Sequence, residues 1–262
     1  MKKYWIVFTK SLKSEMTYRF AALAGVVSAL LGFLIQIFLW KALLGTGVQQ
    51  DTNFSDMLVY VLINSFMMEL TRADVASRIE NAMVDGTVSL ELLRPISYKY
   101  YTLANTFGEN LYGTITRTVP ILLVGAFFIS ADSLPDPVHG ALFAVSALLG
   151  ALLTFQVTYL VGLLAFWLQR SWFVRFYLGG FMKIFGGTVV PLWFYPQFLV
   201  TASYFLPFRY MTFEPINLFL GKTAVEDAWV PILAAALWLV ILSIADKLVL
   251  QAAVKKLTVN GG

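Results

Sequence analysis

Few side chains in this sequence could carry out chemistry, and none is grouped with the partners that a reaction needs. Gly221-Lys222-Thr223 resembles the end of a phosphate-binding loop, in which backbone amides and a lysine hold phosphate oxygens. The glycine that begins such a loop would stand at position 216, which is Ile216. The chain has no HExxH or GxSxG motif, and no paired aspartates within an apolar segment. Enzymatic activity of the chain itself is therefore not expected.

Metal and redox chemistry are excluded on simpler grounds. Cysteine is absent and histidine occurs once, as His139. Thiolate zinc sites, iron–sulfur clusters and disulfides need cysteine, and one imidazole cannot form a multi-histidine site. We predict no catalytic residue, no metal ligand and no cofactor-binding residue in this chain.

Five charged residues fall within or beside apolar segments, where charge is costly and often functional. They are Lys41, Glu69, Glu109, Arg117 and Lys183. We expect the first three to lie at interfaces with water. Arg117 can extend toward the cytoplasm or pair with Glu109. For Lys183 three alternatives stay open: an ion pair inside the bundle, a place on a substrate path, or a misplaced span boundary.

The segment from Asp85 to Ser97, DGTVSLELLRPIS, has the most informative local pattern. Gly86 is suited to end the preceding helix, because glycine readily adopts a positive φ. Thr87 is suited to cap a new helix, and Pro95 to stop it. The pattern predicts a short helix over 87–94.

This predicted helix is amphipathic. Leu90 and Leu93 lie three residues apart and share one face, while Glu91 and Arg94 form a polar edge. Such a helix is typical of a docking element. The alternative is that it rests on the bilayer surface.

The composition identifies the surroundings of these residues. Of the 262 residues, 59% are hydrophobic and only 13% are charged, and the mean hydropathy is +0.74. Soluble domains have about 25% charged residues. A soluble enzyme, a disordered chain and a coiled coil are therefore excluded, and long apolar runs argue against a spanning β-barrel. We predict an all-α membrane protein with a single transmembrane domain, 1–262.

Apolar segments long enough to cross a bilayer, about 20 residues each, predict six transmembrane helices. The expected spans are 20–43, 54–70, 111–130, 140–168, one that begins near Phe176, and 228–245. Fifteen of the 19 Lys and Arg residues fall on the side that holds both termini, whereas Arg209 and Lys222 fall in the opposite loops. Because basic residues favour the cytoplasmic side, both termini are predicted to be cytoplasmic. Since these basic residues are topology signals, we expect no nucleic-acid partner.

Three further segments do not fit a plain six-helix bundle. Residues 1–19 predict an interfacial helix with a stripe of Tyr4, Phe8 and Leu12, and with lysines on its other side. Residues 71–110 form a cytoplasmic region far longer than a helix connection needs. The segment 191–227 is apolar but interrupted by prolines, which predicts a re-entrant helical hairpin and loop on the outer side, between spans 5 and 6.

Two motifs resemble a known family. Gly86-Thr87, followed after four residues by Leu92-Leu93-Arg94-Pro95-Ile96-Ser97, is similar to a signature of type-2 permease subunits of ATP-binding cassette (ABC) exporters. The outer pattern Val190-Pro191-Leu192-Trp193-Phe194-Tyr195-Pro196, with Leu206-Pro207-Phe208, Glu214-Pro215 and Leu220-Gly221, is also similar to that family. The resemblance covers nearly the whole chain, and is to the small six-span bacterial subgroup.

The resemblance implies the membrane-spanning permease of an exporter for an amphipathic substrate: a drug-like molecule, a lipid or a peptide. It implies two copies of a separate cytoplasmic ATPase that bind ATP and Mg²⁺, and a second permease subunit, identical or related. It also implies the bacterial cytoplasmic (inner) membrane. The helix between spans 2 and 3 would be the coupling helix. Its residues would be Gly86, Thr87, Leu90, Glu91, Leu93, Arg94 and Pro95.

Candidates for a substrate path or exit are mostly aromatic. They are Lys183, Trp193, Phe194, Tyr195, Phe198, Tyr204 and Phe208. The aromatic residues could equally form an interfacial belt. Other function classes remain as alternatives: a carrier or channel driven by an ion gradient, or a membrane assembly or sensor protein. An ion-driven carrier would need an inverted repeat or deep acidic residues, and neither is evident.

Overall fold

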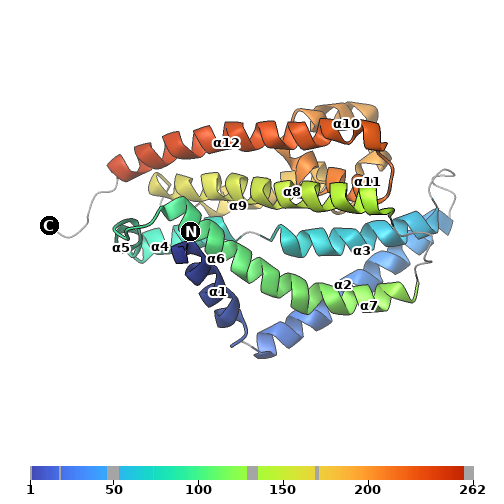
Figure 1. Cartoon of the computed structure of the whole chain (residues 1–262), viewed down its shortest axis with the longest axis horizontal. Coiled ribbons are helices and arrows are strands. Elements are labelled where there is room, and N and C mark those ends of the chain that lie inside the picture. The colour runs from blue at the N-terminus through green and yellow to red at the C-terminus, as the bar shows by residue number, and fades with distance from the viewer. Residues whose placement is uncertain are drawn as a thin grey trace.

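The computed structural model describes residues 2–17, 19–45, 53–72, 74–128, 135–168 and 171–256, and every regular element within them is helical. The long helices lie roughly side by side along the long axis of the molecule (Figure 1). The short helices α4 and α5 lie at the same end as the start of α1 and the last turns of α12. Their bounds are α1 Lys2–Glu15, α4 Val75–Val84, α5 Val88–Leu92 and α12 Trp229–Lys256.

The other elements complete the bundle. The α-helices are α2 Arg19–Gly45, α3 Phe54–Leu70, α6 Tyr98–Gly113, α7 Val119–Ala126, α8 Pro137–Leu163, α9 Trp172–Phe185, α10 Gln197–Tyr204 and α11 Phe213–Phe219. A π-helical turn, Thr114–Thr118, joins α6 to α7. Short 3-10 turns cover Leu164–Phe166, Leu192–Phe194, Pro207–Met211 and Val225–Asp227.

Within the described residues, three helical stretches are long and apolar enough to cross a membrane: Phe20–Gly45, Pro137–Phe166 and Val225–Lys255. The other expected spans are shorter or differ in their bounds. Helix α3 has the predicted limits but only 17 residues, and α9 has 14, or about 21 Å of helix. Helix α9 begins at Trp172 rather than near Phe176, and ends where Gly187 adopts a φ of +69°.

Two helices extend beyond the predicted spans. The third helix begins at Tyr98 instead of 111, since its polar first half packs on α1 rather than lying in water. The last helix continues past Ala245 to Lys256. Asp246 is consequently a buried helical residue and not the start of a tail.

Helix α1 packs on α6. A side chain at Gly108 of α6 would meet the Phe8 carbonyl oxygen at 2.5 Å, so the two backbones touch there. The Ser11 hydroxyl donates to the Asn105 carbonyl at 2.8 Å. The stripe of Tyr4, Phe8 and Leu12 is half-buried, whereas Trp5 is exposed. The predicted stripe thus contacts protein, and other apolar residues of the helix remain exposed.

Helix α8 is the centre of the fold, with α12, α11 and α4 packed around it. Small residues allow this close packing. A Cβ atom at Gly150 would lie 2.3 Å from the Met211 carbonyl oxygen, and one at Gly162 would lie 3.0 Å from the Cα of Ala76. These contacts hold both the proline-rich segment and α4 against the same helix.

Gly150→Ala should therefore destabilise the protein, because the added methyl group meets backbone that cannot rotate away. We expect a loss of about 1–3 kcal/mol, seen as a lower thermal unfolding midpoint in detergent. Gly140→Ala in the same helix is the matched control, since nothing lies within 4 Å of a Cβ built there. It should be neutral, or more stable by up to about 1 kcal/mol from helix propensity. Equal midpoints for the two variants would contradict the close packing.

Candidate functional site

The turn between α4 and α5 is built around one glycine. Gly86 has a φ of +69°, a conformation that L side chains rarely adopt, and it follows the last residues of α4 as predicted. The Thr87 hydroxyl does not cap the next helix. It reaches back instead, 3.4 Å from the Ala82 carbonyl oxygen. Helix α5 is also shorter than predicted, Val88–Leu92 rather than 87–94.

The two faces of α5 have different environments. Val88 is buried, and Leu92 packs on a core cluster that includes Val75 and Tyr159. Leu90 and Leu93 point the other way, and 66% and 79% of their surfaces are exposed. The chain therefore presents two leucines on a helix whose opposite face is fixed to the protein.

The polar edge of α5 is held by α6 and α1. Glu91 forms a hydrogen bond with the Tyr98 hydroxyl, and the Arg94 guanidinium lies 4.8 Å above the Tyr101 ring. The Pro95 carbonyl accepts from Lys3 Nζ at 3.3 Å, and the Ser97 amide donates to the Tyr4 hydroxyl at 3.1 Å. The N-terminal helix thus contacts the chain directly after α5.

Helix α4 is fixed by two ion pairs. Arg78 pairs with Glu109 of α6 at 2.5 Å, and Asn105 donates to the same carboxylate at 3.1 Å. Glu80, on the other side, is buried and accepts from the Ser171 amide at 3.0 Å and from its hydroxyl at 2.6 Å. Arg175 of α9 also pairs with Glu80.

The Glu80 carboxylate is ionised because of these partners. Burial alone would raise its pKa, but the two hydrogen bonds from Ser171 and the charge of Arg175 outweigh burial and lower the pKa below its usual value of 4.5. A stable charge on α4 is thereby tied to the first turn of α9.

A third pair joins the start of α6 to α12. Lys99 Nζ lies 2.8 Å from the Asp246 carboxylate, whose side chain is fully buried. A charge in such a place is stable only with a counter-charge beside it. The pair fixes the start of α6 against the last membrane-length helix.

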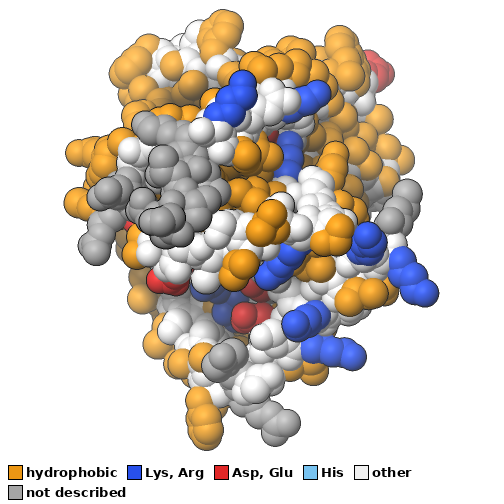
Figure 2. Space-filling model, turned by 90° about the vertical axis from the view of Figure 1, so that its left-hand side faces the viewer, with side chains coloured by type: hydrophobic (Ala, Val, Ile, Leu, Met, Phe, Trp, Pro, Cys, Tyr) orange, Lys and Arg blue, Asp and Glu red, His pale blue; other side chains and the backbone are white. Residues whose placement is uncertain are grey.

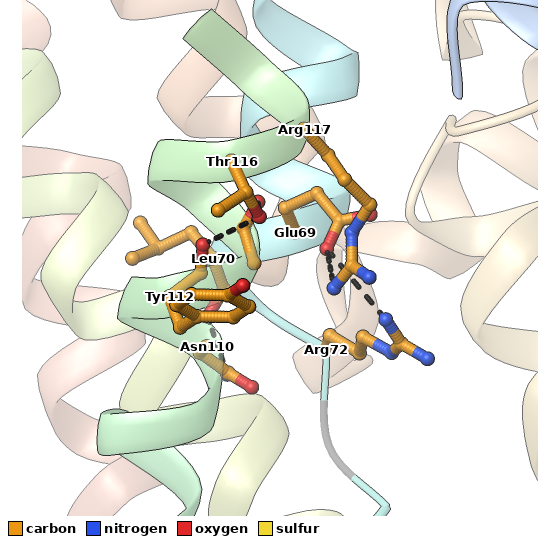
Figure 3. Close-up of polar contacts among 8 residues, drawn as sticks. Glu69, Leu70, Arg72, Asn110, Tyr112, Thr116 and Arg117 are labelled. Atoms are coloured by element: carbon orange, nitrogen blue, oxygen red, sulfur yellow. Dashed lines mark hydrogen bonds and ion pairs between the residues drawn. The ribbon is translucent and has the colours of Figure 1, made fainter. Parts of the chain in front are cut away.

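A fourth ion pair lies where α3 ends (Figure 3). Arg117, in the π turn, pairs with Glu69 at 2.8 Å, and Arg72 approaches the same carboxylate at 3.9 Å. The expected alternative partner, Glu109, is occupied by Arg78. Gly113 provides the space, since a Cβ there would lie 2.3 Å from the Arg117 guanidinium. Arg117 and Glu69 are therefore a matched pair and not two separate interfacial charges.

The candidate path residues do not form one site. Trp193 and Phe194 are half-buried and pack on Tyr60 and Trp40, with ring centroids 5.1 Å apart in both contacts. Tyr195 is half-buried in the same region. Lys183, in the last turn of α9, is exposed, so it makes no ion pair inside the bundle.

The remaining candidates follow the chain breaks at Pro196 and Pro207. Phe198 and Tyr204 of α10 are exposed, and Phe208 stacks on Phe181 of α9 at 6.4 Å. Arg209, predicted as an exposed outer cation, is buried instead.

Arg209 holds this outer segment together. It pairs with Glu214, donates to the Ser203 hydroxyl at 2.9 Å, and lies 3.8 Å from the Tyr204 ring centroid. The pairing connects α10 and the start of α11 through the 3-10 turn Pro207–Met211.

The described residues contain no group of three or more side chains suited to hold a metal ion. Residues 23–261 match the protein family described as ABC-2 family transporter protein. The chain belongs to this family. It is a multi-pass membrane permease, and the ATP-hydrolysing activity of such transporters resides in a partner subunit rather than in this non-catalytic one. A comparison with curated proteins found no match.

Sequence reasoning missed several residues of this permease. Lys99 and Arg175 were counted only as topology signals, and Glu80 and Asp246 were not singled out. Their pairing joins segments far apart in the chain, so no local spacing could reveal it. One usable signal was present: Asp246 follows an apolar run without any break in helix propensity, which argues against a helix end before it.

Glu80→Gln should destabilise the permease by about 1–3 kcal/mol, because it leaves the buried Ser171 and Arg175 groups with a weaker partner. The lowered pKa sets the pH dependence. The ionised carboxylate stabilises the fold above pH 4.5, and this contribution is lost as the pH falls through the lowered pKa. Unfolding midpoints in detergent should differ between variant and wild type at pH 7, and the difference should shrink as the pH falls below 4.5 through the lowered pKa.

Glu226→Gln is the control for this experiment, because Glu226 is an exposed carboxylate on a 3-10 turn. It should match wild type at every pH. A difference between Glu80→Gln and wild type that does not shrink at any acidic pH at which both proteins stay folded would contradict the assigned ionisation.

Proposed function

We propose that this permease is the membrane subunit of an ABC exporter, with α5 as its coupling helix. The observation that carries the proposal is the pair of exposed leucines, Leu90 and Leu93, on a helix whose other face is fixed to the core. A partner groove would bury both side chains, and burial of one leucine contributes roughly 1.5–3 kcal/mol. A charge pair at the rim, from Glu91 or Arg94, contributes about 0–1 kcal/mol.

The complex would contain two copies of a separate ATPase that bind ATP and Mg²⁺, and a second permease, identical or related. ATP binding would close the paired ATPases and shift the population between two arrangements of the spans. The ion pairs of α4 support this role, because they connect the loop that carries α5 to α6 and α9. The substrate would be amphipathic: a lipid, a drug-like molecule or a peptide.

The proposed topology has six crossings in a bacterial cytoplasmic membrane, with both termini inside. Helices α2, α8 and α12 are supported as crossings by length and composition. Helix α9 covers only part of a hydrocarbon core of about 30 Å. The segment 191–227 would complete that side as a re-entrant hairpin, and α1 would lie in the cytoplasmic interface. Phe198 and Tyr204, which are exposed, are the candidates for a substrate exit.

The topology can be tested with single cysteines, because the chain has none. In intact cells an impermeant thiol reagent should label Val225→Cys and leave Leu90→Cys unlabelled. After the membrane is permeabilised, both should react, since both side chains are exposed. Labelling of position 90 but not position 225 in intact cells would invert the topology.

The coupling role can be tested by pull-down of the tagged permease from native membranes in mild detergent. The wild type should recover an ATPase with a phosphate-binding loop. Leu90→Asp should recover at least tenfold less, because it removes an apolar contact and buries an unpaired charge. Arg94→Ala should lose less than about fivefold.

Val225→Asp is the matched control, an exposed apolar residue changed in the same way on the proposed outer side. It should recover the ATPase like the wild type. Undiminished recovery with Leu90→Asp, in a variant that still inserts, would instead favour a helix that rests on the bilayer.

A further inference from the structure

A polar hollow of about 620 Å³ lies beside the coupling region. It is enclosed by the end of α1, the first turns of α2, the segment between α3 and α4, and one side of α6. Figure 2 looks onto the end of the molecule that carries α4 and α5, and shows acidic and basic side chains together in a hollow of this face. The charged lining residues are Glu15, Arg72, Asp74, Arg78, Glu109 and Arg117.

The position of the hollow along the expected membrane normal suits a lipid headgroup. Its α2 wall consists of Ala21, Ala22 and Gly25, in the first two turns of a membrane-length helix. Phe20 and Leu23, on the same turns, are strongly exposed and apolar. The first turns of a spanning helix lie where the hydrocarbon core meets the headgroup layer. A polar cavity there is open to phospholipid headgroups whichever side of the membrane it faces.

The arginines of the hollow retain unused hydrogen-bonding capacity. Arg72 is 59% exposed and lies 3.9 Å from Glu69, too far for a hydrogen bond. Arg78 and Arg117 each place one nitrogen on a carboxylate. Arg78 Nη1 and Arg117 Nε are buried and have no acceptor among the described residues, so the accessible guanidinium group of the hollow is chiefly that of Arg72. Guanidinium groups with free N–H edges are the side chains best suited to phosphate oxygens.

The acids of the hollow are used unequally. Glu109 is bound to Arg78 and Asn105, whereas no ion pair connects Glu15 or Asp74 to another described residue. Asp74 lies at the start of α4 and its carboxylate makes no capping hydrogen bond. Two carboxylates are thus available to a cation. Once the pairs Arg78–Glu109 and Arg117–Glu69 are set aside, one guanidinium group, Arg72, and the two carboxylates remain, so a ligand that carries both an anionic and a cationic group is matched better than a net anion.

We propose that this hollow binds a phosphoethanolamine group. The phosphate would lie against Arg72, whose side chain is exposed, beside the partly exposed guanidinium groups of Arg78 and Arg117. The primary ammonium would donate to Glu15 and Asp74. The group has two sources, the headgroup of phosphatidylethanolamine in the membrane or soluble phosphoethanolamine. The inference does not depend on the export proposal, because binding requires neither the ATPase nor transport.

The test is binding to the delipidated full-length permease in detergent, measured by native mass spectrometry and by titration calorimetry. The ligands are dioctanoyl phosphatidylethanolamine, the matching phosphatidylglycerol and phosphatidylcholine, and free phosphoethanolamine. Phosphatidylethanolamine should bind at least tenfold more tightly than phosphatidylglycerol, which lacks the ammonium. Phosphatidylethanolamine should also bind more tightly than phosphatidylcholine, whose quaternary ammonium cannot donate hydrogen bonds to carboxylates.

The variants separate the two halves of the site. Arg72→Gln should weaken phosphatidylethanolamine binding at least fivefold. The double variant Glu15→Gln/Asp74→Asn should weaken it similarly but strengthen binding of phosphatidylglycerol, because the site gains net positive charge. Lys13→Gln, an exposed lysine of α1 outside the hollow, is the control and should change nothing.

The outcomes are distinct. Free phosphoethanolamine that binds as tightly as the lipid would support the site and assign it to the soluble ligand. Equal affinity for the three lipids would overturn the proposal, and so would an unchanged preference in the double variant. The comparison is valid only for a variant whose unfolding midpoint equals that of the wild type. If Arg72→Gln falls below it, Arg72→Lys, which keeps the charge but loses the planar donors, should still weaken binding.

Discussion

A charged side chain buried in an apolar protein needs an opposite charge beside it. This requirement determines how the helices pack at one end of the permease. Four ion pairs there join segments distant in sequence: Arg78–Glu109, Glu80–Arg175, Lys99–Asp246 and Arg117–Glu69. Removal of one partner would leave a desolvated charge, which costs more than the pair itself contributes. The pairs therefore determine which helices stay together when the bundle changes shape.

These contacts fix α4 and α5 to the rest of the bundle. Helix α4 is tied to α6 and α9, and the residues that follow α5 are tied to α1. Leu90 of α5 and Leu93 directly after it are exposed. A force applied to them would be distributed to α1, α6 and α9 together instead of being absorbed by a loose loop.

The sequence predicted the helical membrane class, the family and the position of α5, because hydrophobic length, Gly86 and Pro95 act locally. It placed α3 correctly for the same reason. It failed where tertiary pairing decided the outcome: α6 begins early because its polar half packs on α1, and Arg209 is buried because Glu214 accompanies it. The partners of Arg117 and Glu80 could not be predicted either, since Glu69 and Arg175 are distant in sequence and other counter-charges lie nearer.

The π turn at Thr114–Thr118 gives the third long helix a change of phase. An additional residue in one turn rotates everything beyond it by about 100° relative to the residues before it. The half before the turn directs Asn110 toward the end of α3, whereas the half after it buries Ile121 in an apolar cluster with α2 and α3. In a regular helix, Asn110 and Ile121 would lie on one continuous stripe. The inserted residue lets one helix direct a polar side chain to its partner before the turn and an apolar side chain into a cluster after it. A substitution near Pro120 that restored a regular helix would keep its length but rotate one half relative to the other.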